Sequence, residues 1–582
     1  MSTMTITSAS SSTTSPSGVV ATTDDAPTAP VLTIDDLAIT YTRGQRRTRA
    51  VGGVSLHIAP GESLAVVGES GSGKSSIARA ALGLLPSSTD ITGQILLNGT
   101  DLRTARPAAA RQLRGTRIGY VPQDPGSSLD PVRRILDQVS EPLRIHGIGD
   151  RAEREQRALQ ALADAGLPDP ERLGRRFPHQ LSGGQRQRVL IAAAIIAKPQ
   201  LIIADEPTSA LDVTVQRVVL DRLQELIASA GTALLMITHD LAVAAQRTDR
   251  VLAMRGGRII EQGSSRQVLL EPREPYTREL VAAMPGRRAS RGVPAGTPHA
   301  AGAPDPSDRK PSDQNLPDLN RPNRSADAPA LAGRGLSRSF GRGSAAVQAL
   351  REATFTLPRG GALGIVGESG SGKTTLARIL LGLEKSDAGT VELDGSPLGK
   401  RDRAFRRRVQ PVFQNPHTSF DPMRTVGWSV LEPVRGLSHM RSRAQQDRLL
   451  AQLFTDVGLD PELAARRPHE LSGGQLQRAA IARALSVDPE ILVCDEAVSA
   501  LDVTVQAKVL DLLARLRRER SLTLLLITHD LAVVEETCPD VLVMQGGRIV
   551  ESGATAAVFA DPQHEVTREL IAAIPDPWAA LP

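Results

Sequence analysis

The sequence has 582 residues, of which 40% are hydrophobic and 23% charged, and its formal net charge is +5. This is ordinary globular composition, and the length indicates two or more domains. The small net charge does not favour a nucleic-acid-binding protein, no apolar run is long enough to cross a membrane, and the two cysteines, Cys494 and Cys538, exclude a four-cysteine zinc or iron–sulfur site.

The N-terminal segment, residues 1–30, is rich in Ser, Thr, Pro and Ala and lacks the basic start and apolar stretch of a secretory signal. We therefore expect a disordered tail there.

Two arginine clusters follow later in the chain, each of which is either a solvated face or a contact with anionic lipid or a membrane partner. They comprise Arg43, Arg46, Arg47 and Arg49, and Arg401, Arg403, Arg406, Arg407 and Arg408.

The chain contains two copies of one domain. GESGSGKS at 68–75 recurs as GESGSGKT at 367–374, and the strings LSGGQ and ITHDLAV also occur twice in the same order. A repeat this long indicates tandem domains, which we place at 31–285 and 331–582. Between them, residues 286–330 are rich in Pro, Ala, Asp and Asn without a helical period, which predicts a flexible linker.

Within each copy, apolar strand-like runs alternate with helical stretches. In the first copy these runs are SLAVVG (63–68), LIIAD (201–205) and ALLMIT (233–238), and the second copy repeats the pattern. Continuous Ile, Leu and Val runs are typical of strands buried on both faces. The sequence therefore predicts an α/β fold with a mostly parallel sheet in each copy.

The GxxxxGK[ST] motif in each copy follows a strand and opens a helix, which is the context in which it binds phosphate. We name residues 68–75 and 367–374 the phosphate loops, and expect Lys74 and Lys373 to reach the β- and γ-phosphates and Ser75 and Thr374 to hold Mg²⁺. The alternative, a chance glycine-rich turn, does not explain two matches in this context. The predicted phosphate-binding residues are Gly68, Glu69, Ser70, Gly71, Ser72, Gly73, Lys74, Ser75, Ser76, Gly367, Glu368, Ser369, Gly370, Ser371, Gly372, Lys373, Thr374 and Thr375.

Paired carboxylates end the next apolar strand of each copy, Asp205–Glu206 and Asp495–Glu496. The aspartate suits the Mg²⁺ shell, and the glutamate is placed to orient or deprotonate an attacking water, although a structural acidic pair is the alternative. A histidine follows one strand later in each ITHD string, His239 and His529. We expect each to contact the γ-phosphate, the alternative being an ordinary end-of-strand residue.

LSGGQ carries no acid, base or metal ligand, but a Gly-Gly step and a Ser hydroxyl at a helix N-terminus form a second anion cradle. The residues concerned are Ser182, Gly183, Gly184, Gln185, Ser472, Gly473, Gly474 and Gln475. Each copy thus has two phosphate-binding devices but one acidic, Mg²⁺-ready group. We expect the copies to face head to tail, so that each LSGGQ covers the nucleotide held by the other copy.

The ordered motifs of both halves, including a Gln in YVPQDP (Gln123) and PVFQNP (Gln414), closely resemble an ATP-binding-cassette ATPase. The resemblance implies two ATP-binding domains, each with a mostly parallel core sheet, a β subdomain and a helical signature subdomain, and it implies ATP and Mg²⁺ as cofactors. It further implies that the two Gln residues sense Mg²⁺ near the membrane-subunit contact, and that Asp212 and Asp502 of SALD link the two sites. Tyr41 matches the family's adenine-stacking aromatic, and Phe340 is its weaker counterpart.

Further details resemble the importers of dipeptides and oligopeptides: QDPGSSLDP after Gln123, EPYTREL at 274–280, and DEPTSALD followed by DEAVSALD. This resemblance implies ATP hydrolysis coupled to uptake, two permease subunits, an extracytoplasmic solute-binding protein and a peripheral position on the cytoplasmic face of the membrane. The cysteine-rich C-terminal segment that binds an iron–sulfur cluster in some relatives is absent, so we expect no cluster. A fused ATPase of a sugar importer and a soluble tandem-cassette translation factor acting on ribosomes remain the alternatives.

Overall fold

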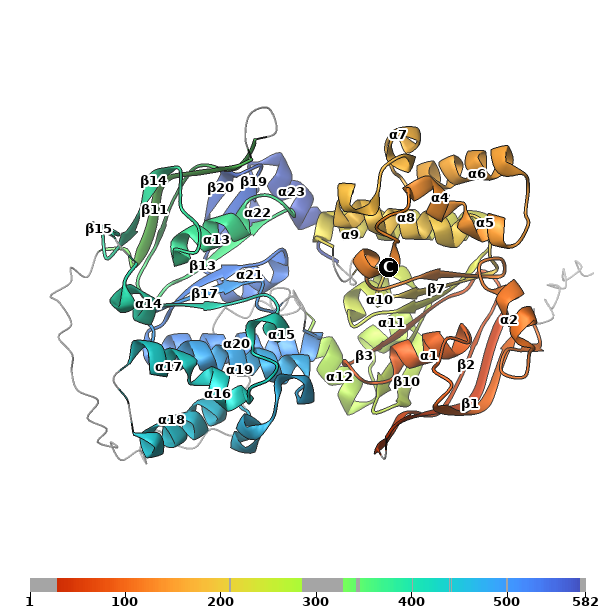
Figure 1. Cartoon of the computed structure of the whole chain (residues 1–582), viewed down its shortest axis with the longest axis horizontal. Coiled ribbons are helices and arrows are strands. Elements are labelled where there is room, and N and C mark those ends of the chain that lie inside the picture. The colour runs from red at the N-terminus through yellow and green to blue at the C-terminus, as the bar shows by residue number, and fades with distance from the viewer. Residues whose placement is uncertain are drawn as a thin grey trace, which may run out of the picture.

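The computed structural model describes residues 29–44, 46–208, 211–284, 328–341, 346–399, 401–438, 440, 442–498 and 501–575. Apart from residues 29–30 and 328–330, the predicted N-terminal tail and linker lie outside these described residues. The two copies form two domains of the same architecture that lie side by side (Figure 1). We call them domain 1 (described residues between 29 and 284) and domain 2 (those between 328 and 575).

A six-stranded sheet forms the centre of each domain. In domain 1 its strands, in sheet order, are β10 (Arg258–Ser264), β9 (Arg250–Arg255), β3 (Ser63–Gly68), β8 (Ala233–Ile237), β7 (Leu201–Asp205) and β6 (Ile118–Val121). In domain 2 they are β20 (Arg548–Ala554), β19 (Asp540–Gln545), β13 (Ala362–Gly367), β18 (Thr523–Ile527), β17 (Ile491–Asp495) and β16 (Val409–Val412). Only the hairpin at the outer edge, β9–β10 or β19–β20, is antiparallel, so the predicted mostly parallel sheet is confirmed.

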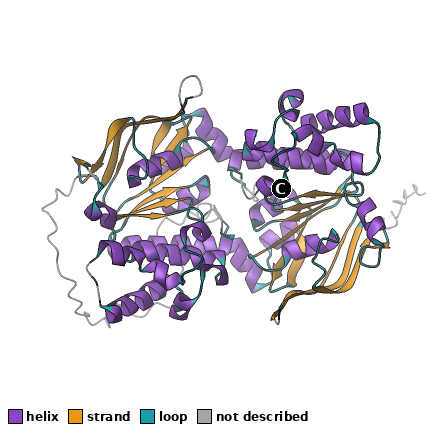
Figure 2. Ribbon diagram, viewed as in Figure 1, coloured by secondary structure: helices purple, strands orange, loops and turns teal. Residues whose placement is uncertain are grey.

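The central strands are apolar along most of their length, as expected for strands whose two sheet faces are covered by helices (Figure 2). Every residue of β7 and β8 is buried. The covering helices of domain 1 are α1 (Lys74–Ala81), α9 (Val213–Ala230), α10 (Leu241–Arg247), α11 (Ser265–Leu270) and α12 (Pro275–Ala282). Their counterparts in domain 2 are α13 (Lys373–Leu381), α20 (Val503–Arg520), α21 (Leu531–Thr537), α22 (Thr555–Ala560) and α23 (Glu565–Ala572).

A second, four-stranded antiparallel sheet forms the β subdomain of each domain. Its strands are β2 (Arg46–Ile58), β1 (Leu32–Arg43), β4 (Thr89–Leu97) and β5 (Thr100–Asp101) in domain 1, and β12 (Val347–Leu357), β11 (Leu331–Phe340), β14 (Ala388–Leu393) and β15 (Ser396–Pro397) in domain 2. Buried side chains such as Ile39, Leu64 and Ile77 join this sheet, the six-stranded sheet and α1 in one core. The phosphate loop therefore emerges from rigid, packed elements.

A helical subdomain is inserted between β6 and β7, and between β16 and β17. It contains α3 (Pro125–Ser128), α4 (Ile135–Val139), α5 (Glu141–Ile145), α6 (Arg151–Asp164), α7 (Pro170–Gly174) and α8 (Gly183–Ile195) in domain 1, and α15 (Pro416–Ser419), α16 (Val426–Val430), α17 (Glu432–Leu437), α18 (Arg443–Asp456) and α19 (Gly473–Leu485) in domain 2. It has its own core in domain 1, around Ile135, Leu162 and Val189. No helix in the described ranges combines the length and the apolar character that crossing a bilayer requires.

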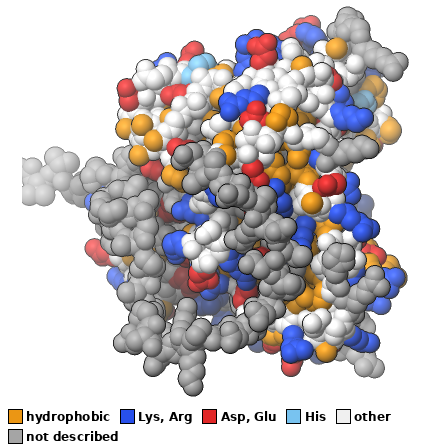
Figure 3. Space-filling model, turned by 90° about the vertical axis from the view of Figure 1, so that its left-hand side faces the viewer, with side chains coloured by type: hydrophobic (Ala, Val, Ile, Leu, Met, Phe, Trp, Pro, Cys, Tyr) orange, Lys and Arg blue, Asp and Glu red, His pale blue; other side chains and the backbone are white. Residues whose placement is uncertain are grey.

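Helices α2 (Pro107–Leu113) and α14 (Arg403–Arg408) precede the helical subdomains, and α14 carries part of the second arginine cluster. The Arg408 guanidinium forms ion pairs with Asp394 at 2.6 Å and with Glu490 at 2.9 Å, and Arg401 donates to the Ile379 carbonyl. On the face shown in Figure 3, Lys and Arg side chains are scattered among acidic, hydrophobic and other side chains. Arg401 and Arg408 therefore tie elements of domain 2 together, a role that the sequence-based alternatives did not include.

Replacing Phe454 with Ala tests the core of the domain 2 helical subdomain. Phe454 on α18 is fully buried, so the cavity left by Phe454→Ala should lower the free energy of unfolding by about 3–5 kcal/mol. Urea or thermal unfolding followed by circular dichroism would measure this. Leu383→Ala is the control: its side chain is 60% exposed, and its loss should cost less than about 0.5 kcal/mol. Equal effects of the two substitutions would contradict the packing described here.

Candidate functional site

The candidate sites lie at the carboxyl ends of the parallel strands. The register pairs Asp205, the last residue of β7, with Ile237, the last residue of β8, and Val66 of β3 with the same Ile237. The three segments that follow these strands, which are the phosphate loop, Glu206 and His239, therefore meet at one edge of the sheet. The same pairing through Ile527 brings the corresponding segments of domain 2 together.

Each phosphate loop closes onto its own lysine. Lys74 Nζ donates to the carbonyls of Gly68 at 2.6 Å and Glu69 at 2.8 Å, and Lys373 makes the same two contacts in domain 2. Burial lowers the pKa of Lys74, while the charge of Glu206 opposes this shift. The helix begins directly after Gly73, whose φ is 102°. A Cβ on Gly73 would lie 2.4 Å from the Ala50 carbonyl oxygen, so only glycine fits this turn.

The predicted Mg²⁺ residues are neighbours in space. Ser75 Oγ donates to Asp205 Oδ1 at 3.0 Å, and burial together with the nearby Glu206 charge raises the pKa of Asp205. In domain 2, Asp495 Oδ1 is buried and has no hydrogen-bond partner among the described residues. A hard cation satisfies such oxygens, so the hydroxyl and carboxylate of each domain fit Mg²⁺. The described residues contain no group of three or more His, Cys, Asp or Glu side chains that could hold a metal. The remaining ligands would come from phosphate, water and the predicted Gln123 and Gln414.

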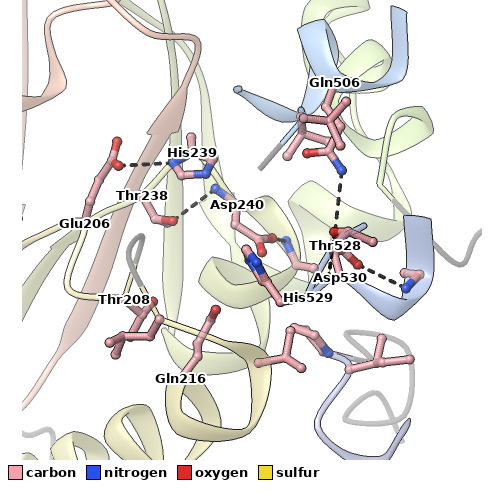
Figure 4. A pocket seen from close by; sticks show the side chains of 18 residues that line it. Glu206, Thr208, Gln216, Thr238, His239, Asp240, Gln506, Thr528, His529 and Asp530 are labelled. Carbon is pink, nitrogen blue, oxygen red and sulfur yellow. Dashed lines mark hydrogen bonds and ion pairs between the residues drawn. The ribbon is translucent and has the colours of Figure 1, made fainter. Parts of the chain in front are cut away.

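The predicted catalytic glutamate of each domain contacts the predicted Gln and His of the same domain. Glu206 Oε2 accepts from Gln123 Nε2 at 3.0 Å and lies 3.2 Å from His239 Nδ1 (Figure 4). Burial would raise the pKa of Glu206, but the hydrogen bond and charge of His239 outweigh it, and the pKa is lowered. Glu496 has the same arrangement with Gln414 and His529. The glutamate is therefore ionised and held in place, as a general base must be. The Gln123 amide meets this carboxylate, and its predicted role in sensing Mg²⁺ stays a prediction.

Both glutamates have left-handed backbones, with φ of 46° at Glu206 and 48° at Glu496. This conformation costs a residue with a side chain on the order of 1 kcal/mol or more and is characteristic of functional sites. The Glu206 N–H donates to the Ile237 carbonyl at 2.8 Å, and the Glu496 N–H donates likewise to Ile527. Nothing in the sequence around the two glutamates predicts this left-handed turn.

The two predicted adenine-stacking residues lie near the ends of corresponding strands but differ in their contacts. The Tyr41 hydroxyl donates to Ser76 Oγ at 3.1 Å, which places the ring beside the start of α1. Phe340 is 41% exposed, and the Arg338 guanidinium lies over its ring at 4.9 Å. Their roles towards adenine stay predictions.

Each LSGGQ segment caps its own helix. In domain 1, Ser182 Oγ accepts from the Gln185 N–H at 3.2 Å, and the Gln185 side chain accepts from the Ser182 N–H at 3.1 Å. Ser472 and Gln475 repeat this capping box. A Cβ on Gly184 would lie 2.4 Å from Val215 at the start of α9, whereas Gly183 has open space around it. The second glycine therefore permits close helix packing, and the first leaves the helix N-terminus open to a ligand.

The SALD segment of domain 1 reaches the phosphate loop of domain 2. Asp212 Oδ2 accepts from the Ser369 N–H at 3.2 Å, and Thr214 Oγ1, which donates to Asp212 Oδ1 at 2.9 Å, lies 3.4 Å from Glu368 Oε1. In the opposite direction, the charge of Asp502 acts on Lys74. The resemblance implied the link through Asp212 and Asp502. Thr214 was missed, although it lies in the repeated string VTVQ that directly follows SALD.

A pocket with a cavity volume of about 130 Å³ lies between the domains. His239 and Asp240 line it from domain 1, and His529 and Asp530 line it from domain 2 (Figure 4). The two edges therefore open towards a common space.

A family model described as ABC transporter matches the sequence twice, at residues 51–209 and at residues 350–499. This chain belongs to the ABC transporter family. A second family model, described as the oligopeptide/dipeptide transporter C-terminal region, matches residues 260–307 of this ABC protein.

Curated relatives cover the whole tandem arrangement. The ABC protein is 40% identical to the glutathione import ATP-binding protein GsiA of Pectobacterium atrosepticum, over 94% of this chain and 89% of that protein. It is 41% identical to the peptidoglycan transport ATP-binding protein YejF of Agrobacterium fabrum, over 94% of this chain and 96% of that protein. GsiA of Escherichia coli is 39% identical, over 94% of this chain and 89% of that protein.

Replacing Asp212 with Asn tests the contact between the domains of the ABC protein. One carboxylate oxygen of Asp212 caps α9 through the Val215 N–H and the other accepts from Ser369. Asn keeps the cap but has only one oxygen, so Asp212→Asn should expose the 367–374 loop. Hydrogen exchange read by mass spectrometry should become about three- to tenfold faster there. The 68–75 loop in the same molecule is the control, and equal acceleration of both loops would contradict the contact.

Proposed function

We propose that this ABC protein is the ATP-hydrolysing subunit of an importer, in which the two domains together drive uptake of dipeptides, oligopeptides or similar small solutes. The observation that carries the proposal is the group formed by Ser75, Asp205, Glu206 and His239 at one sheet edge, present again in domain 2. The match of residues 260–307 to the oligopeptide/dipeptide transporter region supports the class of solute.

In the proposed reaction, Lys74 and Lys373 bind the β- and γ-phosphates of ATP, and the helix N-termini behind them add partial positive charge. Ser75 with Asp205, and Thr374 with Asp495, would hold Mg²⁺, which when bound neutralises phosphate charge. The ionised Glu206 orients a water and accepts its proton, and His239, which lies 3.2 Å from that carboxylate, contacts the γ-phosphate. Glu496 and His529 act in the same way at the second site.

The contact of Asp212 with Ser369 supports the proposed head-to-tail pairing. In the view of Figure 1, α8 of domain 1 lies at about the same height as α13 of domain 2. Likewise, α19 of domain 2 lies at about the same height as α1 of domain 1. We propose that ATP completes each site by bridging a phosphate loop to the LSGGQ helix of the other domain, whose N-terminus binds anions. Closure on ATP and reopening after hydrolysis would then be a two-state switch at the interface between the domains.

The proposed partners are two permease subunits, contacted near Gln123 and Gln414, and an extracytoplasmic solute-binding protein, which places the chain on the cytoplasmic face of the membrane. The relatives named for glutathione and peptidoglycan transport support a peptide-like solute. We propose no nucleic-acid partner and no iron–sulfur cluster. A sugar importer is the second candidate, whereas a ribosome-acting factor is disfavoured because the Pro-rich segment 286–330 does not suit a long helical linker.

The proposed function is tested by Glu206→Gln combined with Glu496→Gln. Glutamine keeps the size of each side chain but cannot accept the proton, so ATP should still bind while steady-state hydrolysis falls by about 10²-fold or more. Cells that depend on this gene should lose uptake of labelled di- or tripeptides to the same extent. Near-normal ATP turnover would contradict the assigned chemistry. Loss of disaccharide uptake would favour the sugar importer, and ATP-dependent binding to ribosomes would favour the translation factor.

The shared-site arrangement is tested by Ser472→Arg. In the proposed pairing, Ser472 of domain 2 faces the nucleotide held by Lys74, so a bulky arginine should weaken photolabelling by an azido-ATP analogue at the domain 1 phosphate loop more than at the domain 2 loop. Ser182→Arg is the matched control, and it should have the opposite preference. Labelling lost within the mutated domain, instead of across the interface, would refute the pairing.

A further inference from the structure

The EPYTREL segment, residues 274–280, holds the phosphate loop of domain 1. It forms the start of α12, and Tyr276 within it is 4% exposed. The Tyr276 hydroxyl accepts from the Glu69 N–H at 3.0 Å, and the Glu69 carbonyl accepts from Lys74 Nζ at 2.8 Å. The backbone N–H and carbonyl of Glu69, the second residue of the loop, are therefore both hydrogen-bonded, the N–H to Tyr276 and the carbonyl to Lys74.

The Tyr276 ring is itself held in place. The Arg255 guanidinium, at the end of β9, lies over the ring at 4.8 Å, a favourable cation–π distance. The preceding residue, Met254, packs its carbonyl against Gly68, where a Cβ would come within 2.2 Å. Burial raises the pKa of Tyr276 to about 12, so the hydroxyl stays neutral. The loop is thus clamped between the end of β9 and α12.

Domain 2 keeps the contact of Met544 with Gly367 but lacks the tyrosine and arginine of this clamp. By the repeat, Gln545 stands at the position of Arg255 and Val566 at the position of Tyr276, so both members of the pair are replaced together. Val566 is 5% exposed and packs into the apolar core. Among the described residues, no side chain accepts from the Glu368 N–H. The domain 2 loop is contacted instead from the other domain, by Asp212 and Thr214.

Helix α12 also contacts domain 2. Glu279 Oε1 lies 3.1 Å from Lys508 Nζ on α20, the helix that Asp502 caps. Tyr276 and Glu279 are one turn apart, so one helix joins the domain 1 loop to the SALD helix of the opposite domain.

We propose that Tyr276 is a positioning residue that anchors the phosphate loop at Lys74 to α12, and that this anchor makes the two ATP sites unequal. The inference rests on the proposed ATP-binding function. Because the loop is held in one conformation before nucleotide arrives, less ordering is needed on binding, and the Lys74 site binds ATP more tightly than it does without the hydroxyl.

Tyr276→Phe tests the anchor, because phenylalanine keeps the ring beneath Arg255 and removes only the hydroxyl. In the full chain carrying Glu206→Gln and Glu496→Gln, the azido-ATP concentration that half-saturates labelling of the domain 1 loop should rise about three- to tenfold. The value for the domain 2 loop should change less than about twofold. Mass spectrometry of the labelled peptides assigns each signal to its domain.

Val566→Ala is the matched control at the corresponding position of domain 2. Val566→Ala removes packing without removing a contact to a phosphate loop, so it should leave both half-saturation values unchanged. The Tm of the Tyr276→Phe variant should fall no more than the Tm of the Val566→Ala variant. The proposed anchor would be overturned if Tyr276→Phe raised the half-saturation value equally at both loops or did not raise it at the domain 1 loop. It would also be overturned if Val566→Ala raised the domain 1 value as much as Tyr276→Phe does. If the chain without Tyr276→Phe labelled at neither loop, the proposed ATP binding would itself fail.

Discussion

The hydrogen bond from the Glu206 N–H to the Ile237 carbonyl joins β7 to β8 at the point where both strands end. It holds Glu206 in a left-handed turn, and the carboxylate can then meet Gln123 and His239, which come from different segments. If that turn relaxed, the glutamate would follow the strand and its side chain would leave the edge. The same bond at Glu496 serves domain 2, so each site depends on a local backbone strain stabilised by the buried sheet.

This constraint explains which differences between the two domains are tolerated. DEPTSALD becomes DEAVSALD in domain 2, yet Glu496 keeps the backbone conformation of Glu206 and its histidine partner. The replaced residues directly follow the glutamate, and among them Thr208 and its counterpart Val498 line the pocket between the domains. The substitution therefore changes the wall of the shared space and leaves the acidic group intact. It distinguishes the two domains without removing either candidate site.

Much of each site could be predicted from sequence because its residues belong to short strings with a fixed relation to a strand end. Lys74 and Ser75 follow β3 and Asp205 ends β7, and the parallel pairing of both strands with β8 brings them to one edge. Contacts between residues far apart in the sequence could not be predicted in this way. Tyr276 meets Glu69 across some two hundred positions, and nothing in EPYTREL indicates that partner. The left-handed turn at Glu206 is likewise imposed by tertiary packing, since glutamate has no preference for it.

The polar contacts between described residues of the two domains are few and mostly exposed, so they contribute little to holding the proposed switch in one state. The Glu279–Lys508 pair is 42% and 62% exposed, and exposed ion pairs contribute at most about 1 kcal/mol. The hydrogen bonds from Ser369 to Asp212 and from Arg217 to the Ala572 carbonyl add a comparable amount. Polar contacts of this strength do not lock the domains together on their own, and the covalent connection keeps each domain at a high effective concentration for the other. ATP bridging the two faces would then decide between the open and closed arrangements, and the asymmetric anchor at Tyr276 would make the two bridges unequal in strength.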